Sequence, residues 1–328
     1  MRAVDAKRAV SLPLPLLPPS PGSPNSPKVS ICVPVYNCAD TIQRTIDSAL
    51  AQTFTDFECL VVDNDSTDST VERILSYDDA RIRLVRNEAN LGGVGNHNKC
   101  LSLARGELVQ FLHGDDWLLP HCLESLVPTF ESANVGLAFA LRRVDTADAS
   151  WKERYARLEG PLRPLHPTND GFELVRRYLA AGGQGNPIGE PTSVMVRHAT
   201  LLAVGGFRPQ IPGMSDIDAW LRLLCRADAA FVDDELTVRW HHAGSETDAQ
   251  KGTHTLDQMW VLADLVRSRG IGTALRMQAF RLWLSAAARL PKTLCHRPRG
   301  QRGQHAMNFA SQARYLATGS MPELQVGQ

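Results

Sequence analysis

Residues 106–120, GELVQFLHGDDWLLP, decide how the rest of the chain is organised. Residues 107–112 are a short apolar run of the kind that forms a buried strand. An imidazole, a glycine and two carboxylates follow it directly, as His113, Gly114, Asp115 and Asp116. In open α/β sheets, ligands collect outside the carboxyl ends of the strands. The stretch therefore predicts a polar site where a buried strand reaches the surface.

The two adjacent carboxylates indicate a divalent cation. Neighbouring carboxylates repel each other unless a cation or a proton lies between them. Mg²⁺-type ions are held by one or two carboxylates together with substrate phosphates. We expect Asp115, with Asp116 beside it, to hold Mn²⁺ or Mg²⁺ and through it a phosphate-bearing substrate. The simpler alternative is that the pair forms a solvated turn and caps a helix that begins near Pro120.

Strand and helix patterns alternate four times from residue 29 to this stretch. Apolar runs at 29–35, 57–62, 81–86 and 107–112 predict strands, and the segments 39–51, 70–76 and 96–104 predict helices. Such alternation is typical of right-handed βαβ units and a parallel sheet. The predicted fold class is α/β, with a Rossmann-like, mostly parallel sheet flanked by helices and followed by a C-terminal helical extension.

Polar residues follow every one of these predicted strands. They are Tyr36 and Asn37, residues 63–68, residues 87–90 and residues 113–116. A nucleotide-binding crevice explains this coincidence best. The first strand is not followed by G-x-G-x-x-G, and the chain has no G-x-x-x-x-G-K-[ST], so the dinucleotide and P-loop motifs are both absent.

Three segments together resemble the family 2 glycosyltransferases with the GT-A fold. They are VSICVPVYN (29–37), FECLVVDNDSTDST (57–70) and NLGGVGNHNKCLSLARGELVQFLHGDDWLLP (90–120). The similarity extends over about residues 28–245. It implies a nucleotide-sugar donor, a divalent cation and inversion at the anomeric carbon.

The resemblance also implies which residues bind the donor. Tyr36 and Asp63 match the residues that contact the base and ribose, and Asp65 is a weaker candidate in the same loop. The remaining expected donor contacts are Pro34, Asn37, Asn90, Gly92, Asn98, His113 and Gly114.

The metal motif of this chain departs from the family pattern. That pattern usually reads D-x-D-D, and here His113 replaces its first Asp, so Asp115 is the best-matched metal ligand, with Asp116 and His113 as further candidates. Imidazole suits transition metals better than Mg²⁺. His97 stands where the family usually has an Arg. Residues 238–247 resemble the family's closing loop, in which His242 would reach the diphosphate or the metal.

Residues 215–222, SDIDAWLR, resemble the family's E-D-x-D-x-W-L-R segment. The matching position makes Asp216 the expected catalytic base, with Asp218 as the alternate, while Ser215 replaces the usual Glu. Either Asp could instead serve only to cap the helix, because a helix N-terminus favours a carboxylate. Glu190 and Trp220 are the expected acceptor contacts.

Further elements define the domain organisation. Helices are predicted at 121–130, 172–181, 254–267, 271–290 and 304–317, strands at 135–141 and 192–197, and an irregular loop at 151–170. We expect a Pro-rich disordered arm at 1–27, a GT-A domain at 28–250 and a basic helical extension at 251–328. Within the GT-A domain, 28–120 would bind the nucleotide and 121–250 the acceptor.

Charge is unevenly spread along the 328 residues. Residues 265–322 carry ten Arg or Lys and no Asp or Glu, whereas the remainder carries 25 basic and 35 acidic residues. This asymmetry indicates either docking of the extension on the acidic remainder or contact with an anionic membrane; no nucleic-acid partner is expected. Seven cysteines without C-x-x-C spacing, and no apolar run of membrane-spanning length, predict a cytoplasmic protein that could be peripheral at the inner face of the membrane.

The sequence thus predicts an inverting, metal-dependent glycosyltransferase. It would move a sugar from a nucleotide sugar, with a UDP-sugar as the expected donor, to a hydroxyl of a glycan or lipid-linked acceptor. The replacements His97, His113 and Ser215 leave open a non-catalytic protein that binds nucleotide or sugar on the same scaffold. A nucleotidyltransferase would also use metal and nucleotide, but the loop after the first strand does not favour it.

Overall fold

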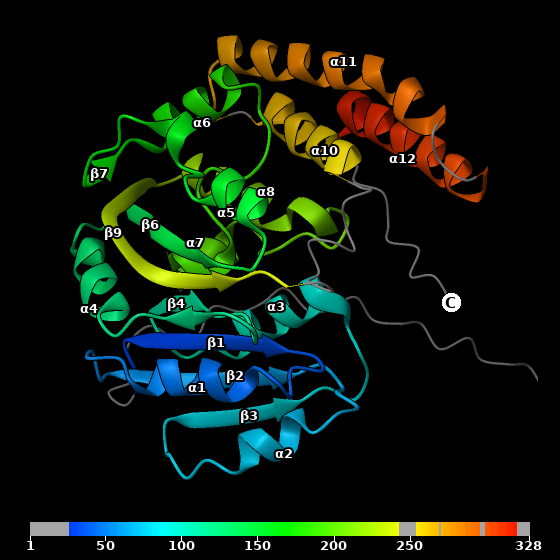
Figure 1. The fold of residues 1–328 in the computed structure, drawn as a ribbon. Coiled ribbons are helices and arrows are strands. Elements are labelled where there is room, and N and C mark those ends of the chain that lie inside the picture. The colour runs from blue at the N-terminus through cyan, green and yellow to red at the C-terminus, as the bar shows by residue number, and fades with distance from the viewer. Residues whose placement is uncertain (1–25, 243–253, 269, 296–298, 320–328) are drawn as a thin grey trace, which may run out of the picture.

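The computed structural model of the chain describes residues 26–242, 254–268, 270–295 and 299–319. It shows one nine-stranded sheet with the strand order β3-β2-β1-β4-β8-β6-β9-β5, and β7 pairs with β9 beside this path. Helices flank the sheet, and α10 to α12 lie together at the edge of the molecule farthest from β3 (Figure 1). The predicted arm at 1–27 falls almost wholly outside the described residues and stays a prediction.

The first half of the sheet is parallel, as predicted. β1 (Val29–Val35) lies between β2 (Phe57–Asp63) and β4 (Leu108–Phe111), and β3 (Ile82–Arg86) pairs with β2. The connecting helices are α1 (Ile42–Leu50), α2 (Thr70–Leu75) and α3 (Gly92–Leu103). Each βαβ unit returns the chain in the same direction, so the polar loops after β1, β2 and β4 emerge at one edge of the sheet.

The second half of the chain makes the sheet mixed. β8 (Val194–Arg197) is antiparallel to both β4 and β6 (Val135–Asp145), and β6 is parallel to the long β9 (Asp228–Trp240). The short strands β5 (Trp117–Leu118) and β7 (Thr168–Asn169) are antiparallel to β9. The remaining elements are α4 (Cys122–Leu126), η1 (Val127–Glu131), α5 (Ala149–Tyr155), η2 (Gly160–Leu162), α6 (Gly171–Ala180), η3 (Pro191–Ser193), α7 (His198–Ala203), η4 (Pro212–Met214) and α8 (Ser215–Leu224).

The sheet buries apolar side chains on both faces. Along β1 and β2, Cys32, Leu60 and Val62 face the core formed with α3, α6, α8 and α10. The alternate residues, among them Ile31 and Val61, face a second core formed with α1 and α4. Successive side chains of a strand point to opposite faces, so a central strand buried on both sides reads as a continuous apolar run.

Two predicted boundaries need correction. The third helix begins at Gly92 rather than at Asn96, because Gly92 adopts a positive φ of 73° that lets the chain turn sharply into the helix. The stretch 151–170 is not irregular throughout. It begins within α5, where the side chain of Asp148 accepts hydrogen bonds from the amides of Ser150 and Trp151 and so caps the helix.

The extension consists of α10 (His254–Arg267), α11 (Thr273–Cys295) and α12 (Arg299–Thr318). Leu256, Met259 and Trp260 of α10 belong to the same buried cluster as the sheet residues of that face. An ion-pair chain adds to this packing, because Arg208 lies 3.0 Å from Asp264 of α10 and 3.3 Å from Asp218 of α8. Among the described residues, no helix has the combination of length and apolar character that crossing a membrane requires.

Candidate active site

Two strand exits are tied together at the predicted nucleotide side. The side-chain oxygen of Asn37 accepts a hydrogen bond from the amide of Thr67 at 2.9 Å, and the amide of Asn37 donates to the hydroxyl of Ser66 at 2.9 Å. Asn37 and Asp65 both have positive φ, 51° and 67°, an uncommon conformation for residues other than glycine and one that concentrates at functional sites. The loops after β1 and β2 thus form one shaped rim.

This rim offers an exposed ring beside a buried acid. The side chain of Tyr36 is 47% exposed, so its ring is available for stacking. Asp63 is fully buried, accepts from the amide of Ser66 and lies 3.5 Å from Nε of Arg86. Asn90 and Gly92 complete the rim, where the side chain of Asn64 donates to that of Asn90 at 2.9 Å. Pro34 is a partly buried residue of β1.

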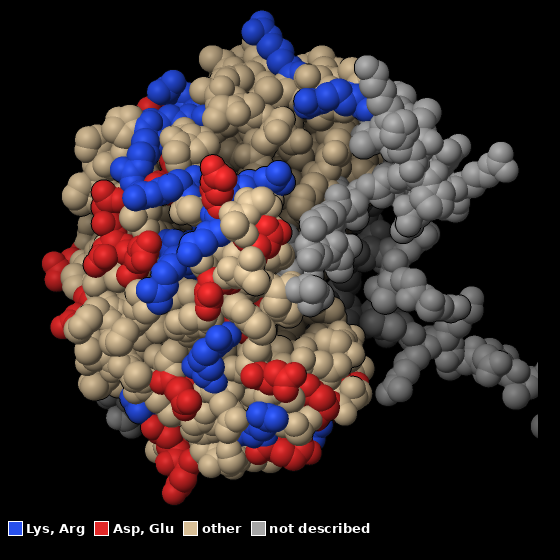
Figure 2. Space-filling view, in the orientation of Figure 1, with Lys and Arg blue, Asp and Glu red and all other residues tan. Residues whose placement is uncertain are grey.

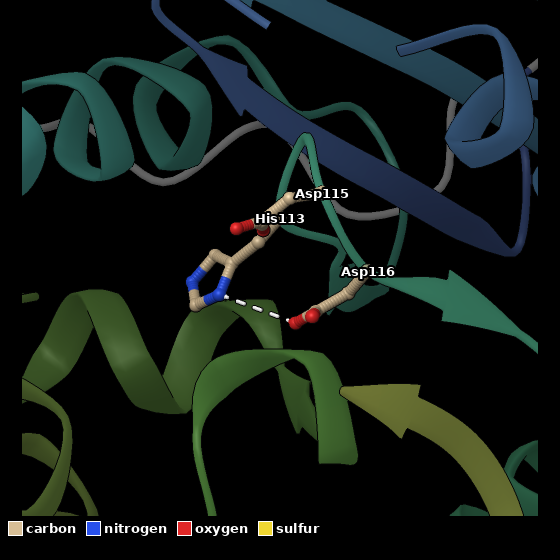
Figure 3. Close-up of side chains that lie close together, drawn as sticks. All are labelled: His113, Asp115 and Asp116. Carbon is tan, nitrogen blue, oxygen red and sulfur yellow. Dashed lines mark ion pairs between the residues drawn. The ribbon is translucent and has the colours of Figure 1, made fainter. Parts of the chain in front are cut away.

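The loop after β4 brings His113, Asp115 and Asp116 together. Their ligand atoms all lie within 4.8 Å of one another, and Figure 3 shows the imidazole turned toward the carboxylate of Asp116. Gly114 is required in this loop, because a Cβ there would lie 2.8 Å from Sγ of Cys38. The loop is therefore held tightly against the segment that follows β1.

The side chains of the cluster differ in their exposure and in their hydrogen bonds to the rest of the protein. Asp116 is buried, and its two oxygens accept from the amide of Trp240 at 2.9 Å and the hydroxyl of Thr192 at 2.7 Å. The side chain of Asp115 is 31% exposed, and one of its oxygens lies 3.3 Å from Nε2 of His242. Asp115 is therefore the carboxylate best able to bind a cation, with His242 beside it.

The charged groups of the cluster shift one another's pKa values. Burial raises the pKa of Asp115, and the neighbouring charge of Asp116 raises it further. Burial alone would lower the pKa of His113, but the hydrogen bond and charge of Asp116, with the charge of Asp115, raise it to about 9. A divalent cation would relieve the repulsion between the carboxylates, and the imidazole of His242 beside Asp115 suits a transition metal such as Mn²⁺ better than Mg²⁺.

His97 fixes the orientation of His113. Burial lowers the pKa of His97 to about 3, so its ring is neutral. Its Nδ1 lies 2.8 Å from the carbonyl oxygen of Gly93, which can only accept, so we assign the proton to Nδ1. Nε2 of His97 then accepts a hydrogen bond from Nε2 of His113 at 3.2 Å, which leaves Nδ1 of His113 facing Asp116.

Asp216 lies in the first turn of α8, half-buried and held from two sides. Its oxygens accept from the amide of Ile217 at 2.7 Å and from the side chain of Asn186 at 2.8 Å. Burial raises its pKa, against the effect of these hydrogen bonds. A positioned carboxylate with a raised pKa is suited to accept a proton.

Asp218, the alternate base, faces the core. Its side chain is 1% exposed and pairs with Arg222 at 2.7 Å as well as with Arg208. In this structure both of its oxygens are engaged with arginines, so it stabilises α8 and is a poor candidate for proton transfer.

Arg239 joins the two acidic groups and was not identified from the sequence. It lies near the end of β9, 3.5 Å from Glu190. Burial works against its charge, but Glu190, Asp116, Asp115 and Asp216 together raise its pKa. The metal loop and the candidate base therefore share one electrostatic environment. The strand β9 was not predicted from the sequence, where residues 238–247 were assigned only to a closing loop, so nothing indicated where its arginine would lie.

The three other predicted contact residues make hydrogen bonds or ion pairs within the protein. Trp220 is fully buried and donates to the carbonyl of Gly189, so it supports the loop that holds Asn186, and its contact with the acceptor stays a prediction. The side chain of Asn98 both donates to and accepts from the backbone of Phe207, and its contact with the donor stays a prediction. Glu190 is buried and paired with Arg142 at 2.7 Å and with Arg239.

Comparisons with known proteins agree on a family. The family model described as Glycosyl transferase family 2 matches residues 30–182. An uncharacterized protein of Mycobacterium tuberculosis (strain CDC 1551 / Oshkosh), MT1568, is 41% identical over 80% of this chain and 84% of its own length. The Escherichia coli enzyme WfgD, a UDP-Glc:alpha-D-GlcNAc-diphosphoundecaprenol beta-1,3-glucosyltransferase, is 37% identical, over 34% of this chain and 44% of that enzyme.

Solved structures share the fold at low sequence identity. The S. aureus protein TarS, residues 1–349 in complex with UDP-GlcNAc, superposes with a TM-score of 0.69 at 16% identity and covers 88% of this chain and 81% of that one. The mannosyltransferase PcManGT from Pyrobaculum calidifontis, in complex with GDP-Man and Mn²⁺, gives a TM-score of 0.57 at 19% identity, over 91% of this chain and 83% of that one. These likenesses confirm the predicted GT-A fold.

Proposed function

Because the chain belongs to glycosyl transferase family 2, we propose that it is an inverting transferase that moves a sugar from a UDP-sugar to an acceptor hydroxyl. The observation that carries the proposal is that two separate carboxylates both raise the pKa of Arg239 and so lie in one site. One is the partly exposed Asp115 of the β4 loop, and the other is the half-buried Asp216 of α8. An inverting transfer needs one carboxylate to hold the metal at the leaving group and a separate carboxylate to act as the base.

In the proposed reaction, the residues of this chain hold the donor and receive a proton. Tyr36 stacks on the base, and Asp63 and Asn37 shape the loop around the ribose. The acceptor oxygen bonds to the anomeric carbon from the face opposite the nucleotide, the bond from that carbon to the diphosphate breaks, and the hydroxyl proton passes to Asp216. Asp115 and His242 would hold the divalent cation, which supplies positive charge to the departing diphosphate. Positioning of the two substrates contributes much of the rate.

The proposed substrates follow from the relatives. WfgD is named for UDP-Glc and for a diphosphoundecaprenol-linked acceptor, and TarS was solved with UDP-GlcNAc. We therefore propose a UDP-hexose donor and a glycan or lipid-linked acceptor, with a role in cell-envelope polysaccharide biosynthesis on the cytoplasmic side of the membrane. Residues 28–120 would bind the donor and residues 121–250 the acceptor.

The test is a panel of UDP-sugars incubated with the full chain, with and without Mn²⁺. Release of UDP from one donor, dependent on the metal and increased by an acceptor glycan, is the expected result. If the chain binds UDP-sugars but releases no UDP with any acceptor, the proposal fails and the non-catalytic binding protein is correct.

Replacing Asp218 with Asn is expected to lower the free energy of unfolding by about 3 kcal/mol, because the buried arginines lose their charge partner. Urea denaturation measures this loss. The turnover of the protein that remains folded should stay near that of the wild type. A large fall in turnover with unchanged stability would show that Asp218 takes the proton instead of Asp216.

A further inference from the structure

We infer that the outer face of α11 is a membrane-contact surface that lies flat on an anionic bilayer. Three large apolar side chains on this helix are exposed: Met277 at 54%, Phe280 at 42% and Leu284 at 46%. Their spacing of three and four residues places them on one face of the helix. We call these three residues the α11 stripe.

A neighbouring face of α11 is already used for packing. Ala279, Trp283 and Ala286 are buried, and the ring of Trp283 stacks on Phe309 of α12 with centroids 5.8 Å apart. Docking of the extension therefore explains the inner face only. Phe280 lies at the border of this packed face, because its ring stacks on that of Trp283 with centroids 6.3 Å apart, whereas Met277 and Leu284 lie farther round the helix. The helix α11 itself lies at the outer edge of the molecule (Figure 1). An exposed apolar row of this kind on a monomer marks an interaction surface.

The charge around the stripe favours an anionic partner. Arg281 is exposed and follows Phe280 directly, and Arg289 is exposed one further turn beyond Leu284. The whole segment 265–322 contains ten basic residues and no acidic one. In the view of Figure 2, the surface over α11 shows basic and uncharged residues without an acidic one, whereas acidic residues appear over the left, middle and lower parts of the molecule.

An anionic bilayer fits this surface better than a second copy of the chain. Two copies joined through α11 would bring basic segments together without an acid between them. A helix with an apolar stripe and flanking arginines instead buries the stripe at the boundary between headgroups and acyl chains. Each basic residue near an anionic surface adds about a fivefold increase in binding. The inference rests on the proposed function in one respect: membrane contact would bring the enzyme to a lipid-linked acceptor.

The experiment is flotation of the full chain with phosphatidylcholine vesicles that contain increasing phosphatidylglycerol, at low and high salt and without any sugar substrate. The wild type should float with anionic vesicles at low salt and less at high salt, because salt screens the attraction. The variant Met277→Ser/Phe280→Ser/Leu284→Ser should lose about tenfold or more of this binding. The variant Arg281→Glu/Arg289→Glu should lose the dependence on anionic lipid.

Matched controls separate the stripe from general effects. Leu75→Ser removes an apolar residue of α2 that is more exposed than any residue of the stripe, and Arg105→Glu/Arg226→Glu reverses two exposed arginines elsewhere; both should float like the wild type. The inference is overturned if the wild type does not float at any composition, if the stripe variant floats unchanged, or if the stripe instead forms a dimer that light scattering detects without lipid. None of these outcomes would bear on release of UDP in solution, so they leave the proposed function untouched.

Discussion

The variant Asp216→Asn is expected to lose about 10³-fold in kcat while its affinity for the UDP-sugar stays near that of the wild type. The amide has the shape of the carboxylate, and its oxygen can still accept from Ile217 or Asn186, so the loop geometry is retained. Only the ability to take a proton from the acceptor is lost. Initial rates measure the fall in kcat, and calorimetric titration with the donor measures the affinity.

The pH dependence of the wild type provides a second readout for the same residue. Because burial raises the pKa of Asp216, the acid limb of the rate profile should lie above the ordinary carboxyl value. Below that limb Asp216 is protonated and cannot act as a base, so the rate falls as the pH falls. The residual rate of Asp216→Asn should lack this limb. A profile that keeps the limb in the variant would assign the proton transfer to another group.

The variant Asp115→Ala is expected to weaken Mn²⁺-dependent UDP binding by about 100-fold, because it removes the exposed carboxylate of the cluster. The fold should remain intact. The carboxylate of Asp115 is partly exposed, and its removal relieves repulsion with the buried Asp116. Calorimetric titration of UDP with and without Mn²⁺ measures the binding, and thermal unfolding without metal measures the stability.

Asp40→Ala is a suitable control for Asp115→Ala. It removes an exposed carboxylate that follows β1 at the same edge of the sheet, and Asp40 is not part of the metal cluster. UDP binding by the control should keep its dependence on Mn²⁺. If Asp115→Ala binds UDP as tightly as the wild type with Mn²⁺ present, Asp115 does not hold the metal.

The parallel half of the fold could be predicted because each of its strands is a continuous apolar run between turn signals. The start of α3 was placed four residues late, since Gly92 and Gly93 are poor helix formers and only the backbone turn at Gly92 shows their role. The helix α5 was missed because its cap, Asp148, precedes a charged segment without a regular apolar period. Both errors come from local backbone chemistry that overrides the average pattern.

Some residues of the candidate site could be located from the sequence, and others could not. The residues that directly follow strands, such as Tyr36 and Asp115, could be located because the end of a parallel strand fixes their edge of the sheet. Arg239 and Asn186 could not, because their positions depend on how β9 pairs with β6 and on how Trp220 holds the loop at Gly189. Asp218 matched a family pattern, yet only the packing of α8 showed that its side chain faces the arginines of the core.

The ion-pair chain from Asp218 through Arg208 to Asp264 limits which segments of this protein can be exchanged with those of a relative. It joins the helix that carries the candidate base to the first helix of the extension. A chimaera that exchanged α10 for the corresponding helix of a relative would remove one of the two acidic partners of Arg208 unless an acid occupied the position of Asp264. We therefore expect residues 208, 218 and 264 to be inherited as one set, and a library that shuffles the extension should fix all three together.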